Sequence, residues 1–182
     1  MKHIFAILTL LFTFNVSIQA QKKVKINQNF ENLERGTDLL TLAKGRFGGW
    51  GKSTWTVTEK KGKGFNNSNK FATSGDAANA TLVKYTNLEV GAAYVFSVAV
   101  KITNTGGQSW KSNYSVKVFS GKGKDDTHMY AKNDVKAGQD NKWEKHNLKF
   151  TVIEGRKNVV LQAYRRTKGV LLHVDDFKLV KK

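Results

Sequence analysis

The feature that most constrains this chain is an alternation of apolar and polar side chains with a period of two residues. In residues 94–103 (YVFSVAVKIT), every second side chain is aromatic or aliphatic, and most of the others are small or polar. Because successive side chains of a β-strand point to opposite faces, this pattern predicts a strand with one buried and one solvated face. The same alternation occurs in residues 114–120, 143–152, 158–166 and 170–180.

Helical periodicity is confined to residues 36–44 (GTDLLTLAK), which allow one or two turns. Weaker strand patterns occupy residues 27–31, 53–58, 70–74 and 79–85. Gly, Asn, Asp and Ser bound these segments, as turn residues do. Roughly eight to ten short strands with glycine-rich turns predict an all-β chain, folded as a β-sandwich jelly roll of two antiparallel sheets.

The composition excludes several classes of protein. The chain has 182 residues, of which 40% are hydrophobic, and it contains no cysteine and no proline. A chain of this size buries enough apolar surface to fold without a disulfide. The absence of cysteine excludes a disulfide scaffold, a thiolate metal site, a cysteine nucleophile and a lipoprotein anchor. With no linker or repeat, residues 21–182 are predicted to form a single domain.

Residues 1–20 have the layout of a secretory signal peptide. Lys2 precedes an apolar run over residues 4–14 (IFAILTLLFTF), and a short polar segment then ends at Ala20. The run is shorter than the roughly 20 residues that a helix needs to cross a membrane. We therefore expect cleavage after Ala20 and a secreted protein, extracellular or periplasmic, without a membrane span. An uncleaved amphipathic anchor is the alternative.

Three stretches together resemble the jelly-roll carbohydrate-binding modules of the family 4, 9 and 22 type. Residues 28–31 (QNFE) are followed, after a gap, by Gly49 and Trp50. Residues 85–101 (YTNLEVGAAYVFSVAVK) resemble the Leu-x-x-Gly-x-x-Tyr-x-x-Ser hairpin of these modules, with Val90 where they have proline. Residues 174–177 (VDDF) are similar to their last strand. The resemblance implies a jelly roll that binds polysaccharide and is not an enzyme.

The resemblance also implies a structural calcium ion that joins the first and last strands. The matching carboxylates are Glu31, Asp175 and Asp176. Calcium takes six to eight oxygen ligands, so backbone carbonyls and Asn29 would have to complete the set. Strict alternation puts Asp175 on the same face as Phe177, pointing inward, which makes it the better ligand. The alternative is that these acids pair with nearby lysines.

The polar faces of the predicted strands combine cations with aromatic rings. Rings stack on the apolar faces of sugars, while Lys and Arg bind carboxylate or sulfate groups. Tryptophans in glycine-containing turns are candidate platforms at the rim of such a face. The predicted ligand-binding residues are Trp50, Lys101, Trp110, Lys117, Phe119, Gln162, Tyr164 and Arg166. The alternative places Trp50 and Trp143 in the core and treats the lysines as a solvated surface.

The charge favours an anionic partner. The chain carries 31 Lys and Arg against 14 Asp and Glu, and loss of Lys2 with the signal lowers the formal net charge from +17 to +16. Such a surface attracts polyanions in a salt-sensitive way. The predicted partner is an acidic or sulfated polysaccharide. A non-specific binder of extracellular DNA or another polyanion is an alternative, although no specific nucleic-acid motif is present.

A polysaccharide lyase or another glycan-active jelly-roll enzyme is the enzymatic alternative. Tyr130 and residues 136–139 (KAGQ) faintly resemble a Tyr-x-Lys-Ala-Gly strand of alginate lyases, but their spacing differs. His128, His146 and His173 are scattered and lack the spacing of zinc ligands. The sequence therefore favours binding over catalysis.

Overall fold

The computed structural model describes residues 24–42, 47–50, 54–106, 113–121, 126–136 and 138–182. These residues form ten strands and one short 3-10 turn, η1 (Phe65–Asn67). The strands are β1 (Val24–Gln28), β2 (Trp55–Glu59), β3 (Lys70–Ser74), β4 (Ala80–Asn87), β5 (Ala93–Asn104), β6 (Tyr114–Ser120), β7 (His128–Val135), β8 (Glu144–Thr151), β9 (Asn158–Arg165) and β10 (Val170–Lys181).

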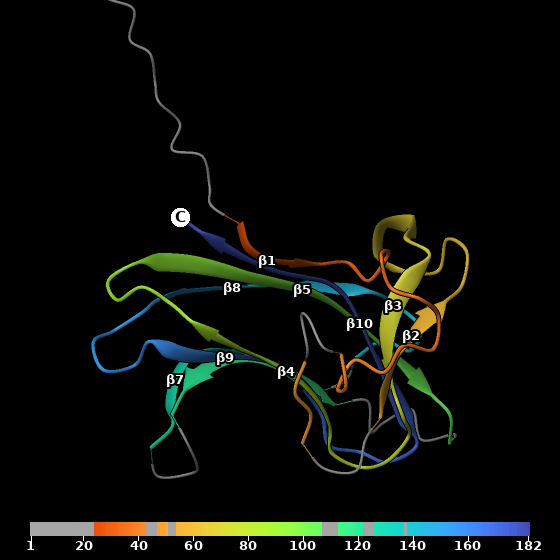
Figure 1. The fold of residues 1–182 in the computed structure, drawn as a ribbon. Coiled ribbons are helices and arrows are strands. Elements are labelled where there is room, and N and C mark those ends of the chain that lie inside the picture. Colours follow the sequence, from red (N-terminus) through yellow and green to blue (C-terminus); the bar gives the residue numbers. More distant parts are fainter. Residues whose placement is uncertain (1–23, 43–46, 51–53, 107–112, 122–125, 137) are drawn as a thin grey trace, which may run out of the picture.

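The strands make two antiparallel sheets that pack face to face (Figure 1). Sheet A has the order β2-β3-β10-β5-β8, and β1 also pairs with β10. Sheet B has the order β4-β9-β6-β7. Consecutive strands thus often lie in different sheets, which is the arrangement of a jelly roll. The predicted fold class is confirmed.

The core lies between the sheets and contains the apolar half of each alternating strand. Tyr94, Phe96 and Val98 of β5 are fully buried against residues of sheet B such as Val116 and Leu161. Sheet packing of this kind leaves the opposite half of each strand on an outer face. The two outer faces are where ligands can reach the strands.

Most strands occur where the alternation predicts them, but β7 is not predicted. Strand β7 lies at the edge of sheet B and pairs with β6. Its consecutive residues Lys132, Asn133 and Asp134 are polar on both faces, so it shows no two-residue period. Residues 36–42 form hydrogen-bonded turns around the buried Leu39 instead of a helix, because Leu39 pairs with Trp55 through its backbone N–H.

The inward position expected for Asp175 is wrong. A β-bulge interrupts the pairing of β10 with β5 between Asp175 and Lys178, and Asp176 has a positive φ of 45°. The extra residue shifts the alternation, so that Phe177 enters the core while Asp175 lies opposite Ala99 on the outer side of sheet A.

The predicted signal peptide, residues 1–20, lies outside the described residues. Within the part of the chain that the structure describes, no helix has the length and apolarity needed to cross a membrane.

Candidate functional site

The outer face of sheet B carries a small apolar cluster that is separate from the main core. Val83 of β4, Phe119 of β6 and Val160 of β9 are buried there. Trp50 lies over the cluster, with its ring centroid 6.2 Å from that of Phe119. The Trp50 indole N–H donates a hydrogen bond of 3.1 Å to the Tyr85 hydroxyl. Trp50 and Tyr85 are therefore hydrogen-bonded to each other on the outer face of sheet B, next to the buried apolar cluster.

Gly48 sets the position of Trp50. The backbone of Gly48 pairs with that of Val83, through N–H···O distances of 2.8 and 2.9 Å. A Cβ at residue 48 would lie 2.8 Å from Val83 Cγ2 and 3.0 Å from Tyr85 Cε2. Only glycine allows this close approach of the 47–50 segment to the edge of β4.

The two rings are open to solvent although they are held in place. Trp50 is 44% exposed and Tyr85 is 58% exposed, whereas Phe119 beneath them is only 8% exposed. Met129, paired with Phe119 across β6 and β7, is 43% exposed and extends the apolar area. We call this area the aromatic half of the site. It offers flat apolar surface to a planar or ring-shaped ligand.

The other half of the same face is cationic. Lys117 of β6 pairs in register with Gln162 of β9 and Lys132 of β7. The Lys117 ammonium lies 5.3 Å from the ring centroid of Tyr164. A hollow of about 330 Å³ opens here, and its lining includes Lys117, Lys132, Tyr164 and Arg166. We call this area the cationic half of the site.

Electrostatics in the cationic half favour an anion. Burial and the charge of Lys132 lower the pKa of Lys117 from its usual 10.5, and Asp134 opposes this effect. Asp134 is already engaged, because it pairs with Lys132 and accepts a 2.7 Å hydrogen bond from Ser115. An incoming carboxylate or sulfate would therefore meet an ammonium that lacks full compensation.

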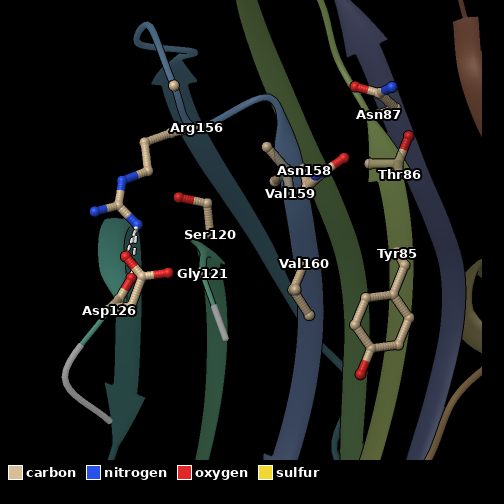
Figure 2. A pocket seen from close by; sticks show the side chains of 11 residues that line it. Tyr85, Thr86, Asn87, Ser120, Gly121, Asp126, Arg156, Asn158, Val159 and Val160 are labelled. Carbon is tan, nitrogen blue, oxygen red and sulfur yellow. Dashed lines mark hydrogen bonds and ion pairs between the residues drawn. The ribbon is translucent and has the colours of Figure 1, made fainter. Parts of the chain in front are cut away.

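A pocket of about 490 Å³ opens at the other end of sheet B, next to the aromatic half. Figure 2 shows Arg156 and Asp126 on one side of it, Tyr85 on the other, and Asn158 between them. The Arg156 guanidinium donates to Asp126 at 2.5 Å, which joins the two loops at the pocket edge. Among the described residues, the buried Ser120 hydroxyl in its lining has no hydrogen-bond partner. The pocket thus adds polar groups beside Tyr85.

The structure brings six of the eight predicted ligand-binding residues onto this one face. They are Trp50, Lys117, Phe119, Gln162, Tyr164 and Arg166. Phe119 and Gln162, the latter 5% exposed, form the floor and are not open platforms.

Lys101 lies apart from this group, because β5 belongs to sheet A, and Trp110 lies outside the described residues. Tyr85 is not among the predicted ligand-binding residues. Its position between the polar residues Lys84 and Thr86, in the exposed half of β4, is the sequence feature that points to it.

The residues expected to hold calcium form hydrogen bonds and ion pairs with protein groups. Glu31 Oε1 accepts the backbone N–H groups of Asn69 and Lys70, at 2.7 and 2.9 Å. The Lys70 ammonium donates to the carbonyl oxygens of Glu31 and Leu33, at 3.3 and 2.8 Å. A lysine cation thus takes carbonyl oxygens of the kind that calcium requires.

The last-strand acids have their own protein partners. Asp175 Oδ2 accepts the Phe65 N–H at 2.9 Å and the Ser68 hydroxyl at 2.5 Å. Asp176 pairs with Lys145. Among the described residues, no group of three or more His, Asp or Glu side chains is placed to hold a metal.

A Tyr–His–Glu arrangement is present but lies between the sheets. The buried Tyr114 hydroxyl donates to Glu144 at 2.8 Å and lies 2.8 Å from His146 Nε2. Burial, followed by the hydrogen bond to Glu144, raises the pKa of Tyr114. Burial lowers the pKa of His146. Both shifts favour the neutral side chain, and the Tyr114 hydroxyl contacts Glu144 and His146 between the two sheets.

Comparisons with solved structures identify the fold. The chain matches the CBM22-1 xylan-binding domain of Paenibacillus barcinonensis Xyn10C with a TM-score of 0.60 and 15% identity, over 88% of this chain and 95% of that one. A putative sugar binding protein from Bacteroides thetaiotaomicron matches with a TM-score of 0.57 and 13% identity, over 85% of this chain and 100% of that one.

A third match is the Clostridium thermocellum endo-1,4-beta-D-xylanase 10B, as its CBM22-1 and GH10 modules complexed with xylohexaose. Its TM-score is 0.57 at 18% identity, covering 87% of this chain and only 28% of that one. No protein-family model and no curated protein sequence matches the chain. At these identities the likeness shows the fold, and the fold of this chain is the β-sandwich jelly roll found in carbohydrate-binding modules.

Proposed function

We propose that this protein is a non-catalytic carbohydrate-binding protein and that the outer face of sheet B binds the polysaccharide. The observation that carries the proposal is the pairing of two exposed, hydrogen-bonded rings, Trp50 and Tyr85, with a cationic hollow on the same face. Solved relatives with this fold include domains named for xylan binding, which supports a sugar ligand.

The preferred ligand is an acidic or sulfated polysaccharide. Sugar rings stack on Trp50 and Tyr85, and a carboxylate or sulfate further along the chain binds Lys117, with Arg166 available for bidentate contact. A neutral polymer uses the aromatic half alone. The apolar run in residues 4–14, preceded by Lys2, supports export, so the polymer would be met outside the cytoplasm.

Affinity electrophoresis in gels that contain polygalacturonate, dextran sulfate or neutral xylan tests the proposal. The Trp50→Ala and Tyr85→Ala variants are expected to lose affinity for polygalacturonate by about fivefold or more, since truncation of a central aromatic contact costs more than about 1 kcal/mol. Tyr85→Phe keeps the ring and should retain most of the affinity. Val90→Ala is the matched control, because Val90 is exposed on the loop before β5.

The charge component is tested separately with Lys117→Gln. This variant should bind polygalacturonate several-fold more weakly and leave any xylan affinity unchanged, because only the acidic polymer uses the ammonium. Lys25→Gln on β1 removes the same charge elsewhere and serves as the control. Equal losses in Lys117→Gln and Lys25→Gln, or no effect of Trp50→Ala on any polymer, would contradict the proposed site.

A further inference from the structure

The outer face of sheet A, on the opposite side of the molecule, carries a second concentration of cations around aromatic rings. Lys101 of β5 lies opposite His173 of β10. Its ammonium is 4.7 Å from the ring centroid of Trp143 and 4.8 Å from that of Phe71. It also donates to the Lys63 carbonyl at 3.3 Å. The rings and this carbonyl hold the ammonium in one place.

Two further lysines belong to this group. Lys60 and Lys63 lie in the turn after β2, which is closed by the Lys63 N–H donating to the Lys60 carbonyl at 3.0 Å. The Trp143 indole N–H donates to the Lys63 carbonyl at 2.9 Å and ties this turn to the end of sheet A. We call Lys60, Lys63 and Lys101 the Lys101 cluster.

The positive charge of the Lys101 cluster is only partly compensated. Burial first, and then the charges of Lys60 and Lys63, lower the pKa of Lys101, and the charge of Asp175 opposes this effect. Within the described ranges, none of the three lysines forms an ion pair. The acid beneath them, Asp175, is buried, and Phe65, Ser68 and Asp176 already donate to its oxygens. Mutually repelling cations whose charge is only partly balanced are stabilised when an anion binds among them.

We propose that the Lys101 cluster is a second ligand site, which binds the sulfate or carboxylate groups of an anionic polysaccharide. It lies on the other sheet from the site proposed above and does not depend on it. Lysine ammonium groups act as point charges and suit such substituents along a sugar chain. Lys101 covers one face of the Phe71 ring and one face of the Trp143 ring, and Phe71 is buried, which leaves less ring surface for stacking on nucleic-acid bases. Two sites on opposite sheets would let one molecule link two polymer chains.

The test uses the Trp50→Ala/Lys117→Gln protein, in which the sheet B site is disabled, and dextran sulfate with unmodified dextran as the neutral reference. Adding Lys60→Gln/Lys63→Gln should weaken dextran sulfate binding about fivefold or more, since each exposed charge contact contributes modestly. Adding Lys25→Gln/Lys149→Gln removes the same charge from exposed positions outside the cluster and should have a much smaller effect. Lys60 and Lys63 are exposed, so these substitutions spare the core.

A second readout is the indole N–H signal of Trp143 in the NMR spectrum, which should shift when a sulfated dextran oligosaccharide is added. Equal losses for the two double substitutions would overturn the proposal, because the charge would then act generically. Cluster-dependent binding of duplex DNA or of phosphatidylserine vesicles that is as tight as that of dextran sulfate would also overturn it, in favour of another class of partner. Failure of the sheet B site alone would appear as unchanged polygalacturonate binding in Trp50→Ala and leaves this test intact.

Discussion

At the scale of single residues, the aromatic half of the site depends on a glycine that does not contact the ligand. Gly48 lets the backbone run against Val83, and this brings Trp50 within hydrogen-bonding distance of Tyr85. The indole is thereby held in one orientation before any ligand arrives. A ring that is already ordered loses less conformational entropy when a sugar stacks on it.

Gly48→Ala is therefore expected to weaken polysaccharide binding about threefold to tenfold, because the new Cβ pushes against Val83 and Tyr85 and moves the two rings apart. The control is Gly106→Ala, whose Cβ would meet its nearest neighbour, the Gly169 carbonyl, at an ordinary 3.7 Å. Both variants would be compared by affinity electrophoresis and thermal melting. A Gly48→Ala protein with unchanged affinity would mean that the orientation of Trp50 does not matter.

At the scale of the elements, a lysine joins the segment after β1 to β3. Lys70 begins β3, and its ammonium reaches back to the carbonyls of Glu31 and Leu33, while the Glu31 carboxylate accepts two N–H groups from Asn69 and Lys70. The Glu31 carboxylate and the Lys70 ammonium therefore each form hydrogen bonds between the segment after β1 and the start of β3. The link thus uses a side-chain cation to hold two carbonyl oxygens, and it joins the segment after β1 to β3, not to the last strand, β10.

Lys70→Met is expected to reduce the free energy of unfolding by about 1–3 kcal/mol, because two carbonyls lose their donor. Lys149→Met, on the solvated face of β8, is the control and should change stability little. We expect a chelator to leave the melting temperature of the unmodified protein unchanged. A melting temperature that drops with chelator and recovers with calcium would contradict this account, since a bound ion stabilises only the folded state.

The strands that the sequence predicts well are those whose environment differs most between their two faces. Strands β5, β6, β8, β9 and β10 each have an apolar core face and an outer face with more polar residues, although Phe119 and Val160 are apolar exceptions on the outer face, and the two-residue period follows from this contrast. Edge strand β7 has no such contrast. The two-residue period likewise does not predict the bulge at Asp175 and Asp176, because the bulge depends on one inserted residue with a positive φ.

At the scale of the whole molecule, the division of strands between two sheets decides which residues can share a ligand. Alternation predicts that Lys101 and Lys117 both leave the core, but it does not say that β5 and β6 lie in different sheets. That assignment comes from long-range pairing, which no local pattern contains. Trp50 and Tyr85 meet for the same reason, since 35 residues separate them in the chain.

Ligand binding on the outer face of sheet B can be followed by an NMR titration of the protein with tetragalacturonate at about 0.15 M salt, where the Debye length is about 8 Å. The account predicts saturable shifts of the Trp50 indole N–H signal and of Lys117, with weaker binding in Lys117→Gln but not in Lys25→Gln. Binding that saturates while the Trp50 and Lys117 signals stay in place, or no binding at all, would contradict the account.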